Sequence, residues 1–128
     1  MQVLIVDSSV QIIERLEEIL AEEENINGIV SAVSYEEAIK LFNEKKPDVV
    51  LLDCSLPGNA SLELLKEIKK ESCKTSVIVL SIQEDNYMQE QCKLLGVDFF
   101  FDKYYGFEKI ARAIKTIAAG KNGANLNI

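Results

Sequence analysis

The sequence contains no histidine and no tryptophan, and it has only three cysteines and two prolines among its 128 residues. Without histidine, the chain cannot form a Ser-His-Asp triad, a Cys-His nucleophile or the usual Cys/His zinc site. The cysteines, Cys54, Cys73 and Cys92, form no C-x-x-C pair. We therefore expect three reduced thiols in a cytoplasmic protein.

Basic residues are also scarce relative to acidic ones. Fourteen Lys and Arg residues face 21 Asp and Glu residues, so the net charge is −7. An acidic domain without a basic run binds nucleic acids and anionic membranes poorly through its own surface. No apolar stretch approaches the roughly 20 residues that cross a bilayer, and the start, MQVLIVD, is not typical of a signal peptide. We expect neither nucleic acid nor membrane as a partner of this domain.

Short apolar runs alternate with segments of helical periodicity along the chain. The runs are Val3–Val6, Ile29–Val33, Val49–Leu52, Val77–Leu80 and Phe99–Phe101. Continuous apolar runs are typical of strands covered on both faces in a parallel sheet. Right-handed crossovers then give an α/β fold, a three-layer α/β/α sandwich whose five-stranded parallel sheet most often takes the order 2-1-3-4-5. We predict one domain over residues 1–120 and a flexible tail or linker stub over residues 121–128.

Two of the expected helices begin with a capping signal. Ser8-Ser9-Val10-Gln11 precedes the first helical segment, and Ser34-Tyr35-Glu36-Glu37 opens the second. In a capping box the first and fourth side chains satisfy backbone N–H groups that the helix start leaves without partners. We therefore predict that Ser8 and Ser34 cap these helices.

Polar residues follow four of the apolar runs, at the points where the predicted strands end. They are Asp7, Asp53, Ser81 and, after Asp102, Lys103. The carboxyl ends of parallel strands lie on one edge of a sheet, and the crevice where the strand order reverses is where such sheets bind ligands. We expect Asp7 and Asp53 to lie side by side, with Ser81 and Lys103 flanking them.

Two neighbouring carboxylates repel each other unless a cation lies between them. Lys103 is one candidate for this cation, and a divalent metal is the other. Oxygen ligands without histidine or cysteine suit Mg²⁺. Aspartate is a known phosphoryl acceptor, and a metal, a lysine and a hydroxyl offset the charge of a moving phosphoryl group. The pattern therefore indicates a phosphoryl-transfer site.

Four segments at these strand ends resemble the receiver domain of bacterial two-component response regulators. They are VLIVDSS, PDVVLLDCSLPG, VIVLS and GVDFFFDK, and the resemblance covers about residues 2–119. It implies a flavodoxin-like fold with Asp53 as the phospho-acceptor and with Ser81 and Lys103 assisting at the site. It also implies that Ser81 and Phe100 act together as switch residues.

The resemblance further implies a magnesium site, with one departure from the family pattern. Mg²⁺ would be held by Asp7, Asp53 and the backbone carbonyl of Ser55. The family usually has two adjacent acids in its first motif, whereas here Asp7 is followed by Ser8. A hydroxyl is a weaker ligand than a carboxylate, so Ser8 is a doubtful ligand and we predict weak Mg²⁺ binding.

As a function, the resemblance implies a stand-alone receiver in a phosphorelay. It would take a phosphoryl group from a sensor histidine kinase or a phosphotransfer protein and switch a surface for an unidentified downstream protein, and a homodimer is compatible with it. Its only catalysis would be its own phosphotransfer and autodephosphorylation, so we do not expect an enzyme. The alternative is a pseudo-receiver, a protein-interaction module with the same fold that is not productively phosphorylated.

Two other classes of protein share parts of this pattern. Haloacid-dehalogenase-like phosphatases also use an Asp nucleophile, a Ser or Thr, a Lys and Mg²⁺. Their first motif needs a second acid two residues after the nucleophile, where this chain has Ser55. A flavodoxin-like FMN protein needs a phosphate-binding loop after the first strand, where Asp7 would repel a phosphate. The residues therefore favour the receiver over both.

Overall fold

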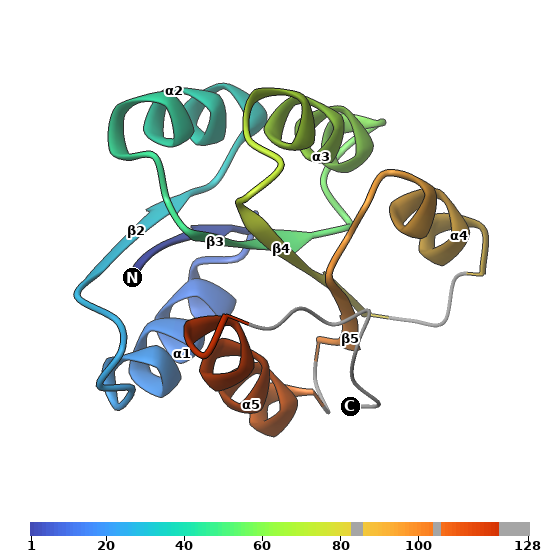
Figure 1. The fold of residues 1–128 in the computed structure, drawn as a ribbon. Coiled ribbons are helices and arrows are strands. Elements are labelled where there is room, and N and C mark those ends of the chain that lie inside the picture. Colours follow the sequence, from blue (N-terminus) through green and yellow to red (C-terminus); the bar gives the residue numbers. More distant parts are fainter. Residues whose placement is uncertain (83–85, 104–105, 121–128) are drawn as a thin grey trace.

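A computed structural model describes residues 1–82, 86–103 and 106–120 of the chain. The strands are β1 (Gln2–Val6), β2 (Gly28–Ala32), β3 (Val49–Asp53), β4 (Ser76–Ser81) and β5 (Phe99–Asp102). They pair in parallel in the order β2-β1-β3-β4-β5 (Figure 1), which confirms the predicted sheet. The predicted tail, residues 121–128, lies outside the described residues.

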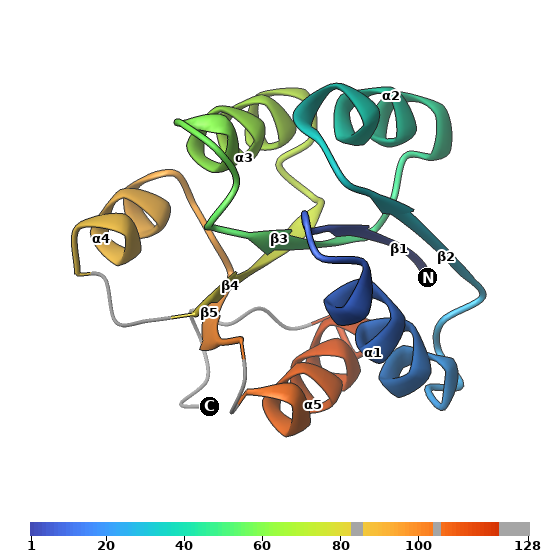
Figure 2. The same cartoon turned by 180° about the vertical axis from the view of Figure 1, so that it is seen from behind.

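Helices cover both faces of this sheet. They are α1 (Val10–Ala21), α2 (Tyr35–Lys45), α3 (Ala60–Glu71), α4 (Asn86–Leu94) and α5 (Phe107–Ala118). Helices α2, α3 and α4 pack on one face and α1 and α5 on the other, as both views show (Figures 1 and 2). The predicted three-layer sandwich is therefore confirmed. No helix within the described ranges is long and apolar enough to span a bilayer.

The strands divide the core into two layers because successive side chains point to opposite faces of a sheet. In β1, Val3 and Ile5 pack toward α1 and α5, whereas Leu4 and Val6 pack toward α2, α3 and α4. Every residue of β3 is buried, since β3 lies between two neighbouring strands. Most of the edge strand β2 is only half-buried. The central strands are therefore buried within the core, and the residues at their carboxyl ends are held by this packed core.

The predicted cap of the first helix is wrong by one residue. Ser9, not Ser8, is the N-cap of α1, and its Oγ accepts the N–H of Ile12 at 3.3 Å. Asp7 causes this difference, because its Oδ1 accepts the N–H of Ser9 at 2.8 Å. This bond turns the chain at the end of β1 and leaves Ser8 exposed to solvent.

The second helix follows its prediction more closely. Ser34 is the N-cap of α2, and its Oγ accepts the N–H of Glu37 at 3.3 Å. The Glu37 side chain, however, accepts the N–H of Val33 at 3.5 Å instead of that of Ser34. The helix ends at Lys45, and Lys46 takes a left-handed conformation (φ 47°) before Pro47, which cannot continue a helix.

Candidate functional site

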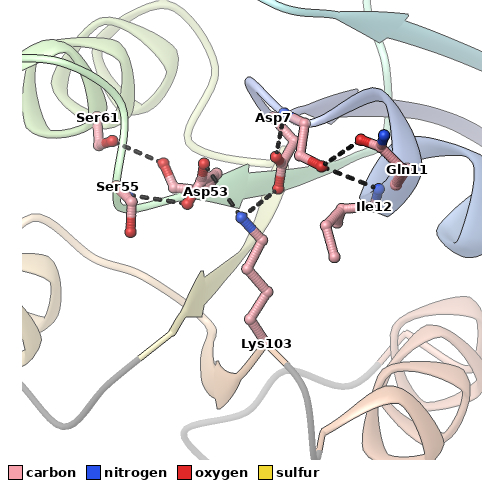
Figure 3. A network of polar contacts seen from close by, with 8 residues as sticks. Asp7, Gln11, Ile12, Asp53, Ser55, Ser61 and Lys103 are labelled. Atoms are coloured by element: carbon pink, nitrogen blue, oxygen red, sulfur yellow. Dashed lines mark hydrogen bonds and ion pairs between the residues drawn. The ribbon is translucent and has the colours of Figure 1, made fainter.

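Two aspartates and one lysine meet at the carboxyl edge of the sheet. Asp7 follows β1, Asp53 ends β3 and Lys103 follows β5, and these residues are 1 %, 1 % and 5 % exposed. Lys103 Nζ lies 2.8 Å from Asp7 Oδ2 and 3.3 Å from Asp53 Oδ2 (Figure 3). The structure thus places one buried ammonium group between two buried carboxylates.

The backbone holds both carboxylates in the same way. Oδ1 of Asp7 accepts the N–H of Ser9 at 2.8 Å, and Oδ1 of Asp53 accepts the N–H of Ser55 at 2.9 Å. Aspartate favours this bond to the backbone two residues later where a chain turns. One oxygen of each carboxylate is therefore fixed by its own turn, while Oδ2 of each faces Lys103.

Burial and charge act against each other at this site. The pKa of Asp7 lies above its usual value, because burial and the charge of Asp53 raise it. Hydrogen bonds from Lys103 and Ser9 lower this pKa only in part. Burial lowers the pKa of Lys103, but the hydrogen bond with Asp7 and the charges of both carboxylates outweigh it, so this pKa lies above its usual value. With all three groups ionised the site carries one uncompensated negative charge, which attracts a further cation.

The donor atoms of the site suit a magnesium ion. Oδ2 of Asp7 and Oδ2 of Asp53 are buried and both face the same Lys103 ammonium, so each of these oxygens keeps a lone pair that can bind a cation. Mg²⁺ is usually bound through one or two carboxylates, with water molecules filling the rest of its shell. Among the residues that the structure describes, no three acidic, cysteine or histidine side chains gather into a metal cluster. The residues present therefore fit Mg²⁺ with two carboxylates.

The other predicted site residues differ in how deeply they are buried. Ser81 ends β4, is 4 % exposed, and its carbonyl accepts the N–H of Lys103 at 2.7 Å. Phe100 is half-buried in β5 and packs against the core layer beneath α2, α3 and α4. Ser8 and Ser55 are exposed. Each of these two serines closely follows a buried aspartate in the sequence.

One polar contact at the site does not follow from the sequence pattern. Ser61 Oγ donates to the backbone carbonyl of Asp53 at 2.6 Å, and Ser61 is buried (Figure 3). A serine near the start of a helix is usually interpreted as a cap for that helix. The only signal in the sequence is a small hydroxyl residue shortly after the candidate nucleophile, and serine is common in turns and at helix starts whether or not it contacts a functional residue.

The chain belongs to the response regulator receiver domain family, whose pattern it matches over residues 3–115. It is thus a receiver domain of a response regulator in two-component signalling. Receiver domains are generally not classical enzymes. Similar curated proteins are longer than this chain. Response regulator GacA of Pseudomonas aeruginosa is 28 % identical over 120 residues, which cover 94 % of this chain and 56 % of the relative.

A second relative is the DNA-binding transcriptional activator EvgA of Escherichia coli. It is 29 % identical over 86 residues, which cover 67 % of this chain and 41 % of the relative. The chain therefore spans about half the length of the curated relatives that it matches.

Solved structures agree on the fold. The isolated receiver domain of RcsB from Salmonella enterica serovar Typhimurium, solved with the phosphomimetic BeF₃⁻, has a TM-score of 0.83 and 21 % identity. The match covers 95 % of this chain and 91 % of that one. A LuxR-family response regulator from Aurantimonas has a TM-score of 0.84 and 20 % identity, with 94 % and 86 % covered.

Proposed function

We propose that Asp53 accepts a phosphoryl group from a sensor histidine kinase or a phosphotransfer protein, and that the modified domain then presents an altered surface to a downstream protein. The observation that carries this proposal is the buried Lys103 ammonium between the Asp7 and Asp53 carboxylates. A fixed cation beside the nucleophile offsets the negative charge that a phosphoryl group brings, at no cost of reorganisation during the transfer.

In the proposed transfer, a carboxylate oxygen of Asp53 attacks phosphorus and the P–N bond of a phosphohistidine breaks. The donor imidazole leaves with the bonding electron pair and the product is an acyl phosphate on Asp53. The Lys103 ammonium faces the negative charge of the phosphoryl group. We propose that the hydroxyl of Ser81 donates a hydrogen bond to a phosphoryl oxygen. Water later hydrolyses the acyl phosphate and restores Asp53, so phosphotransfer and autodephosphorylation are the only catalysis we assign to the domain.

Asp7, Asp53 and the backbone carbonyl of Ser55 would hold the Mg²⁺ ion. When bound, this ion supplies positive charge that offsets the charge on the phosphoryl oxygens. Because only two carboxylates contribute, and Ser8 offers no charge, we propose weak binding.

Replacing Ser8 with Asp should tighten Mg²⁺ binding by about tenfold to a hundredfold, a gain of roughly 1–3 kcal/mol. A third carboxylate adds attraction to the cation, although desolvation and the loss of water ligands cancel most of it. The start of α1 should survive because Ser9 is its N-cap. Isothermal titration of each protein with MgCl₂ measures the change.

Ser8→Asn is the matched control, because asparagine has nearly the shape of aspartate and no charge. We expect its affinity to remain close to that of the native chain. If Ser8→Asp binds Mg²⁺ no better than Ser8→Asn, residue 8 does not face the metal position and the proposed ligand set must be redrawn.

The pseudo-receiver remains the second candidate, and one experiment separates the two. The native chain is incubated with acetyl phosphate and Mg²⁺ and its intact mass is measured. We expect the addition of one phosphoryl group. If the chain takes no label under conditions that label a control receiver, it is a protein-interaction module without productive phosphorylation.

We propose proteins as the partners of this domain. The net charge of −7 disfavours contact with nucleic acid, even though the relative EvgA is named a DNA-binding activator. A cytoplasmic location and a domain boundary at residue 120 are further parts of the proposal, which is compatible with a homodimer.

Ser81→Ala should leave labelling possible but remove the conformational response. In the proposed switch, a phosphoryl oxygen draws the buried hydroxyl of Ser81 inward, Phe100 fills the space left behind, and the surface near α4 shifts between two states. Amide hydrogen exchange in α4, compared before and after labelling, measures this response. Ser76→Ala, at the opposite end of β4, is the control. An unchanged response in Ser81→Ala would contradict the coupling.

A further inference from the structure

A buried hydroxyl in the first turn of α3 contacts the backbone of the proposed phospho-acceptor. Ser61 Oγ donates to the carbonyl oxygen of Asp53 at 2.6 Å, and Ser61 is 4 % exposed (Figure 3). We propose that Ser61 is a positioning residue that holds Asp53 and the start of α3 in a fixed relation. This inference rests on the proposed function, because it concerns how readily Asp53 reacts.

The carbonyl of Asp53 lies where the strand ladder ends. The N–H of Cys54 donates toward β4, so the backbone groups of the preceding residue, Asp53, face the side of β1. The pairing of β1 with β3 ends one residue earlier, at Val6 and Leu52. A buried carbonyl at this point needs a donor from outside the ladder. Ser61 supplies that donor.

The start of α3 also lacks the usual anchor. Its N-cap residue, Asn59, makes no side-chain cap hydrogen bond. The hydroxyl of Ser61 connects the helix to the end of β3 instead, across eight residues of sequence. The turn between these two points contains Ser55, whose N–H holds Asp53 Oδ1 at 2.9 Å. Asp53 is thus held both at its carbonyl and at its carboxylate.

These two hydrogen bonds act on different groups of the same residue. The bond from Ser55 orients the Asp53 carboxylate, and the bond from Ser61 fixes the backbone that carries it. The remaining carboxylate oxygen, Oδ2, lies 3.3 Å from Lys103 Nζ. Phosphoryl transfer depends on in-line geometry, and a misplacement of about 1 Å can slow a reaction on the order of a hundredfold. Loss of the Ser61 bond should therefore reduce the rate of labelling.

Ser61→Ala should lower the rate of phosphoryl labelling about fivefold to thirtyfold at fixed acetyl phosphate and Mg²⁺ concentrations. The physical reason is that Asp53 then loses its backbone anchor while every group at the reacting end of its side chain is kept. Ser61→Thr retains the hydroxyl and should restore the rate to within about twofold of the native value. Intact-mass time courses measure all three proteins, and circular dichroism checks that each is folded.

Thr75→Val is the matched control, because it removes a similar bond at the opposite edge of the sheet. Thr75 is 5 % exposed and its Oγ1 donates to the Pro47 carbonyl at 3.3 Å. Thr75 lies at the opposite edge of the sheet from Asp53, so Thr75→Val should lower only the stability and leave the labelling rate at the native value. The expected result is therefore slow labelling in Ser61→Ala and native labelling in Thr75→Val.

The outcomes separate this inference from the proposed function. Labelling of Ser61→Ala at the native rate, equal slowing by Thr75→Val, or a failure of Ser61→Thr to restore the rate each overturns the positioning role. A native chain that takes no label overturns the proposed function itself, and the inference falls with it. If Ser61→Ala does not fold, Ser61→Cys replaces it, since a thiol of similar size is a weak donor and should give an intermediate rate.

Discussion

Asp53→Asn is expected to abolish the phosphoryl adduct that the native chain forms with acetyl phosphate and Mg²⁺. An amide has nearly the shape of a carboxylate but is a far poorer nucleophile, so no acyl phosphate forms. The fold should survive the change, because the variant removes one of two buried carboxylates that repel each other across a single lysine. Intact-mass spectrometry before and after incubation measures the adduct.

Asp102→Asn is the matched control for this experiment. Asp102 ends β5 on the same edge of the sheet, but it is exposed, whereas Asp53 is buried beside Lys103. The control should be labelled like the native chain. An adduct that persists in Asp53→Asn would place the acceptor at another residue, and an adduct lost only in Asp102→Asn would identify that residue.

Lys103→Met should lower the free energy of unfolding by about 3 kcal/mol, because removing one partner of a buried ion pair leaves uncompensated charge in a poorly solvated site. Here two carboxylates, each 1 % exposed, lose the ammonium that separates them. Methionine keeps much of the length and apolar surface of the lysine side chain. The fall in the free energy of unfolding therefore results mainly from the removed charge. Urea denaturation of the native and variant proteins measures the difference.

Lys69→Met provides the comparison. Lys69 pairs with Asp98 at 3.0 Å, but the two side chains are 16 % and 17 % exposed, so water still screens the pair. We expect Lys69→Met to lower the free energy of unfolding by about 1 kcal/mol. Adding Asp7→Asn to Lys103→Met should recover part of the stability. If Lys103→Met is no more costly than Lys69→Met, the charges of the candidate site are better solvated than their burial indicates.

Several features of the fold could be predicted from local pattern alone. Five apolar runs separated by helical segments leave few arrangements other than a parallel sheet with helices on both faces, because crossovers between parallel strands are right-handed. The position of Asp7 and Asp53 at the ends of two such runs was enough to expect them together. The pattern does not, however, predict the two matching turns in which the N–H groups of Ser9 and Ser55 donate to these carboxylates.

Two details of the site could not be predicted in this way. Ser8 and Ser9 are both good caps by residue type, and the choice between them depends on where β1 stops and on the bond from Ser9 to Asp7. The contact of Ser61 with the Asp53 carbonyl depends on where the β1–β3 ladder ends. The order of apolar and polar residues marks where the strands stop, but it carries no signal for the turn that follows Asp7 or for the group that donates to the Asp53 carbonyl.

Local sequence pattern therefore predicts the order of the elements, the sheet they form and the edge at which the acidic residues and Lys103 gather. It could do so because hydrophobic period and strand-end polarity are local properties. It does not predict that one ammonium group lies within 3.3 Å of both carboxylates, or that a hydroxyl from α3 donates to the Asp53 carbonyl. These contacts join residues of different strands and helices, and their geometry depends on how these elements pack against one another.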